Sequence, residues 1–273
     1  MGSNRAESRI DAALTTKPPG LWPFLAAGYP SLDATAAMLR ALAALPIRGV
    51  ELGFPFSDSI ADGPVIQHAF GQALAGGVHV NAIFEMVTKA RREIDYPLLA
   101  MVSASIVYRM GVEAFISRTA TAGFDGLIVP DLSLEEAPAI AKVVAQAGLR
   151  LSMLIAPTTP PDRERQIADV ASGFLYYVSV QGTTGERQAL PADLPDHVGR
   201  IRKATGLPVL VGFGIGTPRQ VQDVCAYSSG AIVGSAIVRR IKTDLDARRG
   251  TEQIVRAAVQ FIAELAGAAP TVH

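Results

Sequence analysis

The feature that most constrains the fold of this chain is an alternation of eight short apolar runs with segments of helical pattern. The runs are apolar without interruption, as expected of parallel strands that are buried on both faces. Eight strand–helix units over about 250 residues predict an α/β fold, a single (β/α)8 TIM barrel. The predicted strands cover residues 21–27, 50–53, 97–103, 126–129, 149–155, 174–179, 208–211 and 231–233.

The chain is predicted to form one domain over residues 1–273, because no linker or change of composition marks a second one. Residues 1–19 are expected to form an N-terminal extension with a short helix near residues 5–14. The alternative fold is an open doubly wound sheet, which would need a G-x-G-x-x-G fingerprint at its first strand–helix turn. The first turn here is Gly28-Tyr29-Pro30, so the barrel is preferred.

The charge balance argues against two classes of function. Lys plus Arg and Asp plus Glu both number 25, which gives a net charge of zero and no sign of a nucleic-acid footprint or a polybasic membrane surface. No apolar run is long enough to span a bilayer. The single cysteine, Cys225, excludes a disulfide within the chain, and residues 1–6 contain no apolar signal core. We therefore expect a cytoplasmic protein with no nucleic-acid or membrane partner.

Two acids lie on either side of a loop that follows the second predicted strand. Glu51 is inside the apolar strand, and Asp62 comes eleven residues later, just before a predicted helix. Burying an acid costs free energy unless the group has a partner or a task. We interpret the two side chains as carboxylates that face one pocket. The alternative is that Glu51 pairs with a core arginine and Asp62 caps the helix.

Polar and glycine-rich segments follow the later strands, at the end of the barrel where active sites of this fold lie. Glycine lets backbone amides approach a phosphate group, and the N-terminus of a helix adds partial positive charge. We therefore predict a phosphate site at these turns, the alternative being that the glycines only form tight turns. The segments are Asp131, Tyr176, residues 182–185, residues 212–216 and the pair Gly234-Ser235.

Two other catalytic classes find no support in the sequence. None of the lysines is predicted to project from a strand end into the pocket, which argues against a Schiff-base aldolase. The four histidines are scattered and form no ligand cluster with Cys225, which argues against a catalytic metal. The remaining chemistry is cofactor-free acid–base catalysis by carboxylates on a phosphorylated small molecule.

These motifs resemble the tryptophan synthase alpha chain family. The similarity is most specific in the segments ELGFPFSD (residues 51–58) and ADGPVIQ (residues 61–67), and it extends over about residues 8–265. The resemblance implies an α/β barrel that splits indole-3-glycerol phosphate into indole and glyceraldehyde 3-phosphate. Further segments that fit the family are residues 24–30, 126–131, 183–185, 212–215 and 234–238.

The resemblance also implies roles for individual residues. The catalytic positions match Glu51, Asp62 and Tyr176, of which Glu51 is the acid–base. The substrate-binding positions match Phe24, Gly185, Phe213, Gly214, Gly234 and Ser235. The positions that couple loop closure to a partner match Asp58, Asp131 and Thr184. The implied partner is a beta chain that carries pyridoxal phosphate and joins indole to serine in an α2β2 complex, whereas this chain needs no cofactor or metal of its own.

The chemistry of the residues agrees with these roles. Protonation at indole C3 turns the ring into an electron sink, so the carbon–carbon bond can break without a lysine or a metal. Burial beside a strand is expected to raise the pKa of Glu51 and suit it to giving that proton. Asp62 can accept a hydrogen bond from the indole N–H and stabilise the positive charge that develops on the ring.

The chain differs from the family pattern at two places. After the third strand the family often has Met-x-Tyr-x-Asn, whereas here Ser103 and Ser105 stand at the tyrosine and asparagine positions. Ser59 follows Asp58 where proline is common. The first change concerns the packing against the catalytic loop and the coupling to the partner, and the second concerns the rigidity of that loop. Three functions are therefore compared: the alpha subunit of a two-chain enzyme, a free-standing indole-3-glycerol-phosphate lyase, and a weakly catalytic barrel that activates a beta chain.

Overall fold

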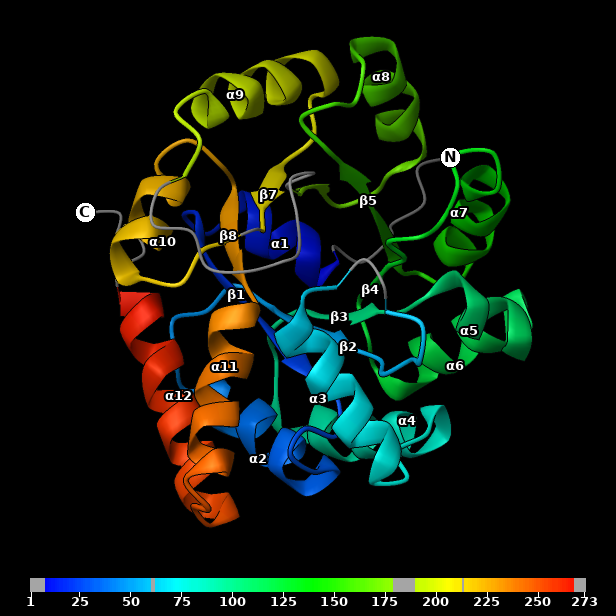
Figure 1. Cartoon of the computed structure of the whole chain (residues 1–273). Helices are drawn as coiled ribbons and strands as arrows, with labels where there is room; N and C mark the ends of the chain where they lie inside the picture. The colour runs from blue at the N-terminus through cyan, green and yellow to red at the C-terminus, as the bar shows by residue number, and fades with distance from the viewer. Residues whose placement is uncertain (1–7, 60–61, 179–189, 213, 268–273) are drawn as a thin grey trace.

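The structure, a computed structural model, describes residues 8–59, 62–178, 190–212 and 214–267. In this part of the chain, parallel strands follow one another in chain order around a closed barrel, and β8 pairs with β1 (Figure 1). The predicted (β/α)8 barrel is therefore confirmed. The strands are β1 Gly20–Ala26, β2 Val50–Gly53, β3 Leu98–Met101, β4 Gly126–Ile128, β5 Arg150–Ile155, β6 Leu175–Tyr177, β7 Val209–Val211 and β8 Gly230–Val233.

Helices surround the barrel, and the last two of them pack beside the first strand and its helix (Figure 1). The last two helices therefore close the ring against the first strand and its helix. The helices are α1 Arg9–Thr15, α2 Leu32–Leu42, α3 Pro64–Ala75, α4 Val80–Ala90, η1 Arg91–Glu93, α5 Ala104–Met110, α6 Val112–Ala122, α7 Ala137–Gln146, α8 Pro161–Val170, α9 Leu194–Thr205, α10 Pro218–Cys225, α11 Ser235–Asp246 and α12 Thr251–Gly267.

One element was missed by the sequence analysis. The predicted strand over residues 97–103 ends at Met101, and a short helix, α5, follows it directly. Ser103 caps this helix, since its side chain accepts a hydrogen bond from the backbone N–H of Ser105. A serine just before a helix is an ordinary N-cap signal. It was missed here because the predicted strand was extended through residue 103. Among the described helices, none is long and apolar enough to cross a membrane.

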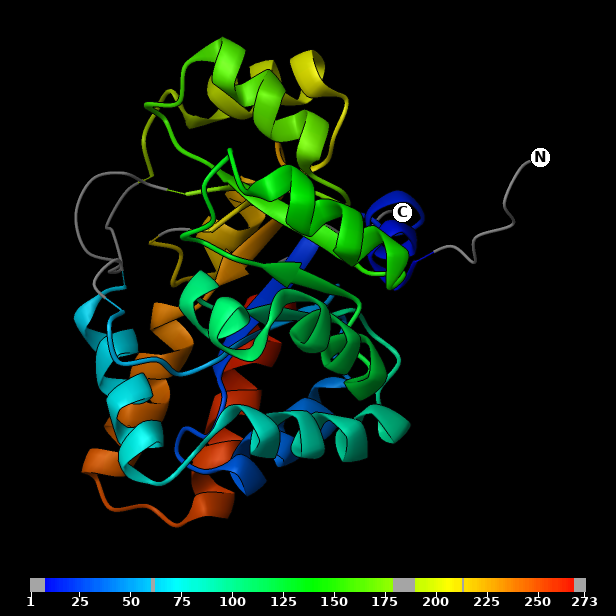
Figure 2. The same cartoon turned by 90° about the vertical axis from the view of Figure 1, so that its right-hand side faces the viewer.

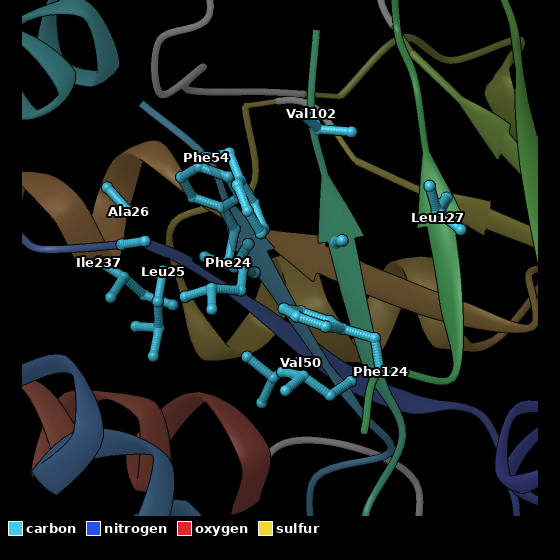
Figure 3. Packing of buried hydrophobic residues seen from close by; sticks show 14 of the residues in the cluster. Phe24, Leu25, Ala26, Val50, Phe54, Val102, Phe124, Leu127 and Ile237 are labelled. Atoms are coloured by element: carbon cyan, nitrogen blue, oxygen red, sulfur yellow. The ribbon is translucent and has the colours of Figure 1, made fainter. Parts of the chain in front are cut away.

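The buried apolar side chains form two layers. One layer lies between the strands and the surrounding helices, where for example Leu25 of β1 lies near Ile237 of α11 (Figure 3). The second cluster fills the barrel itself and includes Trp22, Phe174 and Tyr176. Because the two faces of each strand meet apolar neighbours, the strands read as continuous apolar runs in the sequence.

Trp22 fills the amino-terminal half of the barrel, and glycines on the neighbouring strands make room for it. Its side chain is fully buried and packs against Phe174, with ring centroids 5.8 Å apart. A Cβ atom at Gly49 would lie 2.1 Å from the Trp22 ring, and one at Gly230 would lie 2.9 Å from its Nε1. Side chains at these two positions would therefore displace the indole.

Helix α1 closes this end of the barrel (Figure 2). Its Ile10 is fully buried in the interior cluster, and its Asp11 forms an ion pair with Arg150 at the start of β5. Nearby, Asp125 accepts hydrogen bonds from Arg9 and Arg91 and also receives the backbone N–H of Leu98. With the amino-terminal end filled, the open space of the barrel lies at the carboxyl ends of the strands.

Candidate active site

Glu51 lies inside the barrel wall on β2, in register with Phe24 of β1 and Leu99 of β3. Its side chain is fully buried, and neither carboxylate oxygen has a hydrogen-bond partner among the described residues. Burial raises the pKa of Glu51 to about 8, so the group holds its proton at neutral pH. The alternative in which Glu51 pairs with a core arginine is therefore wrong for the described part of the chain.

Asp62 lies at the rim, just before α3. Burial raises its pKa to about 6, although its side chain is only partly covered. Gln67 of α3 donates hydrogen bonds from Nε2 to the backbone oxygens of Ser59 and Asp62, at 3.0 and 2.9 Å. The N-cap of α3 is Gly63, without a side-chain cap bond, so Asp62 does not cap this helix. Its carboxylate instead lines the cleft described below.

Tyr176 of β6 brings a phenol to the same region. Burial raises its pKa, and the negative charges of Glu51 and Asp62 raise it further. This electrostatic effect indicates that the three predicted catalytic residues share one environment, although they come from β2, the following loop and β6. Gly212 at the end of β7 is needed there, since a Cβ atom at this position would lie 2.5 Å from the Tyr176 hydroxyl oxygen.

A cleft with about 540 Å³ of empty space opens at the carboxyl ends of the strands, and the fully buried Glu51 is not among its described lining residues. Six of the predicted site residues line it: Phe24, Asp62, Tyr176, Gly214, Gly234 and Ser235. Sequence reasoning missed the apolar side chains of Ile66, Met101, Ile215 and Ile232 in the lining. The strand pattern gave no signal for Met101 and Ile232, because inward and outward positions are equally apolar. Gly185, Thr184 and Phe213 lie outside the described residues.

One side of the cleft is suited to an anion. Gly214 has a left-handed backbone, with φ of +62°, and Gly234 precedes the first turn of the twelve-residue helix α11. The first turn of α11 carries no acid, and no Lys or Arg is among the described residues that line the cleft. Backbone amides and the Ser235 hydroxyl are therefore the donors available to a phosphate on this side.

Of the two serines that depart from the family pattern, Ser103 is hydrogen-bonded to Asp131 and Ser105 to Ser103. The Ser103 hydroxyl donates to Asp131 Oδ2 at 2.7 Å, and the backbone N–H of Ala104 donates to Oδ1 at 2.8 Å. Ser103 and Ser105 also share a hydrogen bond of 2.8 Å. Asp58 and Asp131 are both exposed, and Asp131 is fixed to the start of α5 by these hydrogen bonds. The described residues contain no group of three or more His, Cys, Asp or Glu side chains that could hold a metal ion.

A parallel barrel with a protonated acid buried in its wall, and with a cleft lined by a second carboxylate and glycine turns, defines a class of enzymes that work by acid–base chemistry. A family model for the tryptophan synthase alpha chain matches residues 11–269. The chain belongs to this family. It is a carbon–carbon lyase of tryptophan biosynthesis that cleaves indole-3-glycerol phosphate.

Individual relatives support this assignment. The chain is 44% identical to the tryptophan synthase alpha chain of Rhodopirellula baltica over 81% of each chain. It is 43% identical to that of Chloroflexus aggregans over 93% of each. The crystal structure of the alpha subunit from Legionella pneumophila is similar with a TM-score of 0.87 and 32% identity, over 96% of this chain and 98% of that one.

Replacing Glu51 with Gln is expected to change how stability depends on pH. The pKa of Glu51 is about 8 in the folded protein and 4.5 ordinarily, so between these pH values the folded chain keeps a proton that the unfolded chain releases. The free energy of unfolding should therefore fall as pH rises from about 4.5 to about 8, by up to roughly 4 kcal/mol from this group. Glu51→Gln cannot ionise and should lack this contribution.

Urea unfolding of both proteins at pH 5 and pH 8 measures the effect. All other titrating groups are common to the two proteins, so the difference between their pH dependences reports on Glu51. An equal loss of stability in both would show that the carboxyl group is not protonated in the folded state.

Proposed function

We propose that Glu51 is the acid that protonates indole C3 of the substrate. The observation that carries this proposal is a fully buried carboxyl group, without a partner among the described residues, whose pKa is raised to about 8. Protonation gives an iminium-like ring, and the bond between C3 and the glycerol chain then breaks with its electrons moving into that ring. The ionised Glu51 takes the proton released by the side-chain hydroxyl as the aldehyde forms, which restores the acid.

Asp62 is proposed to hold the indole N–H and to stabilise the positive charge on the ring. Its pKa of about 6 means that it is ionised at neutral pH, while Glu51 is protonated. Two carboxyl groups with separated pKa values are suited to different roles in one reaction. The raised pKa of Tyr176 keeps its phenol neutral. Tyr176 is proposed to donate a hydrogen bond to the substrate and so to orient it towards Glu51.

The phosphate is proposed to bind at Gly214, Gly234 and Ser235, together with Gly185. The indole is proposed to lie against Phe24 and Phe213. Support comes from the cleft itself, where glycines and Ser235 lie over β7 and β8 and Phe24 lies on β1. We propose that this chain needs no cofactor, because Glu51 transfers the proton and Asp62 stabilises the positive charge that forms on the ring.

We further propose that the chain works with a beta chain in an α2β2 complex. Pyridoxal phosphate in that partner would join the released indole to serine. Asp58, Asp131 and Thr184 are the residues proposed to couple the two chains. The exposure of Asp58 and the fixed position of Asp131 beside the rim are consistent with this role.

Glu51→Gln is expected to lower single-turnover indole release by about 10²–10⁴-fold, because the amide keeps the size of the side chain but cannot transfer a proton. Binding of the substrate should survive. Asp62→Asn should also slow turnover, since a neutral amide stabilises a cationic ring poorly. Melting temperatures of both variants serve as the folding control, and a folded Glu51→Gln protein with near-normal release would falsify the mechanism.

The pH profile of kcat/KM separates the two carboxyl groups. Activity should fall above about pH 8, where Glu51 ionises, and below about pH 6, where Asp62 takes up a proton. A phosphate monoester also titrates near pH 6. The acidic limb is therefore assigned by its change in Asp62→Asn, which removes the contribution of Asp62 and keeps that of the substrate.

Gly234→Asp is expected to weaken substrate binding by at least tenfold through bulk and charge repulsion with the phosphate. Gly234→Asn is the matched control, because it adds the same bulk without charge. The Cβ atom of either variant is accommodated without a clash, since it would lie 3.4 Å from the nearest atoms of Phe24. Calorimetric titration with an uncleavable substrate analogue measures the difference. If Gly234→Asp and Gly234→Asn bind the analogue with the same affinity as each other, the added charge has no effect and the phosphate lies elsewhere.

The partner is tested by measuring indole release with and without a beta chain at matched concentrations. The two-chain enzyme predicts complex formation on a sizing column and a several-fold rise in kcat. A free-standing lyase predicts high activity that the beta chain leaves unchanged. A chain that only activates its partner predicts slow indole release in both conditions, together with faster chemistry in the beta chain.

A further inference from the structure

A second cavity adjoins the active-site cleft. It contains about 760 Å³ of empty space and shares Phe24, Asp62 and Met101 with the cleft. We call this cavity the annex. Its other lining residues are Phe54, Phe56, Asp58, Phe70, Val102, Ser103, Pro130 and Asp131. Phe54 directly follows β2, the strand next to that of Phe24, and Val102 directly follows β3, the next strand along (Figure 3).

The annex lies on the side of the cleft away from the proposed phosphate site. Gly214, Gly234 and Ser235 line the cleft but not the annex. Asp62, the proposed partner of the indole N–H, lines both. A substrate that binds with its phosphate on the glycines and its N–H on Asp62 therefore directs the benzo edge of its indole towards the annex.

The walls of the annex are mainly aromatic and apolar. The ring of Phe70 lies 5.9 Å from that of Phe56 and 6.5 Å from that of Phe24, measured between centroids. The polar groups of its wall are largely used by one another, because Ser103 donates to one oxygen of Asp131 and Ala104 N–H to the other. An occupant therefore meets mainly apolar surface, with the carboxylates of Asp58 and Asp62 as the other polar side chains of the described lining.

The charges around the annex are negative. Asp58, Asp62 and Asp131 all line it, and no Lys or Arg is among its described lining residues. An anionic group placed there would meet repulsion without a compensating cation. The annex thus favours neutral, apolar groups over carboxylates.

We propose that the annex is a specificity subsite that accepts small apolar substituents on the benzo ring of the substrate's indole. The proposal rests on the substrate orientation proposed above. The substituent is remote from C3, so the reaction itself is unchanged. A methyl group that becomes fully buried contributes up to about a fourfold gain in binding. Val102 and Phe56 are both wall residues, and the size of their side chains limits the size of the subsite.

The test measures kcat/KM for indole-3-glycerol phosphate and for four derivatives with one methyl group at position 4, 5, 6 or 7. At least one derivative is expected to be cleaved as well as the parent substrate, within threefold or better. The carboxylate at that same position should lower kcat/KM by at least tenfold. If all four methyl derivatives are cleaved tenfold or more slowly than the parent substrate, the proposal is wrong.

Val102→Phe should fill the annex and lower kcat/KM for the accepted methyl derivative at least tenfold more than for the parent substrate. Phe56→Leu widens the annex and should favour an ethyl group at the same position relative to the parent substrate. The two variants act in opposite directions, so a folding defect in one leaves the other informative. Leu134→Phe, in a separate cavity lined by Leu134, Met153 and Ile167, is the matched control.

The parent substrate distinguishes the possible failures. If the unmodified protein does not cleave it, the proposed function fails. If Val102→Phe lowers kcat/KM equally for parent and methyl substrates, the annex serves another purpose, such as passage of product or contact with a partner chain, and the specificity subsite is wrong. A change of ratio in Leu134→Phe as large as that in Val102→Phe would also overturn it.

Discussion

The carboxyl group of Glu51 lies in a barrel wall where no described side chain offers it a hydrogen bond. Ionising it there would cost several kcal/mol, so the folded chain holds it in the protonated form at neutral pH. Much of the site follows from this constraint. A protonated acid can give its proton to a carbon atom only if it is held rigidly near the substrate, and the pairing of β2 with β1 and β3 supplies this rigidity.

The amino-terminal half of the barrel makes the position of Glu51 possible. Trp22 fills the interior between Gly49 and Gly230, and Ile10 of α1 packs into the same cluster. Dense packing on this side excludes water and leaves the cleft on the other side. The stability of the fold and the location of the active site are therefore two results of the same packing, since the barrel is solid at one end and open at the other.

Different kinds of chemical group lie in different parts of the cleft and the adjoining annex. Donors for an anion lie over β7 and β8, apolar and aromatic side chains lie over β1 to β4, and Asp62 stands between the two regions. A substrate with a phosphate at one end and an indole at the other fits this division. Ser103 belongs to the apolar side, where it donates to Asp131, shares a hydrogen bond with Ser105 and leaves a smaller wall than a tyrosine would.

The sequence by itself determined the number and order of the strands, the helix after almost every strand, the two acids around the β2 loop, and the glycine turns after β7 and β8. Each of these is a local pattern of apolar runs, helix caps or turn residues. Only the tertiary structure decided that Tyr176 shares an environment with Glu51 and Asp62, that Gly212 makes room for it, and that Met101 and Ile232 line the cleft. Strands that are apolar on both faces do not reveal which residues point inward, because that choice depends on the register between strands and on closure of the barrel.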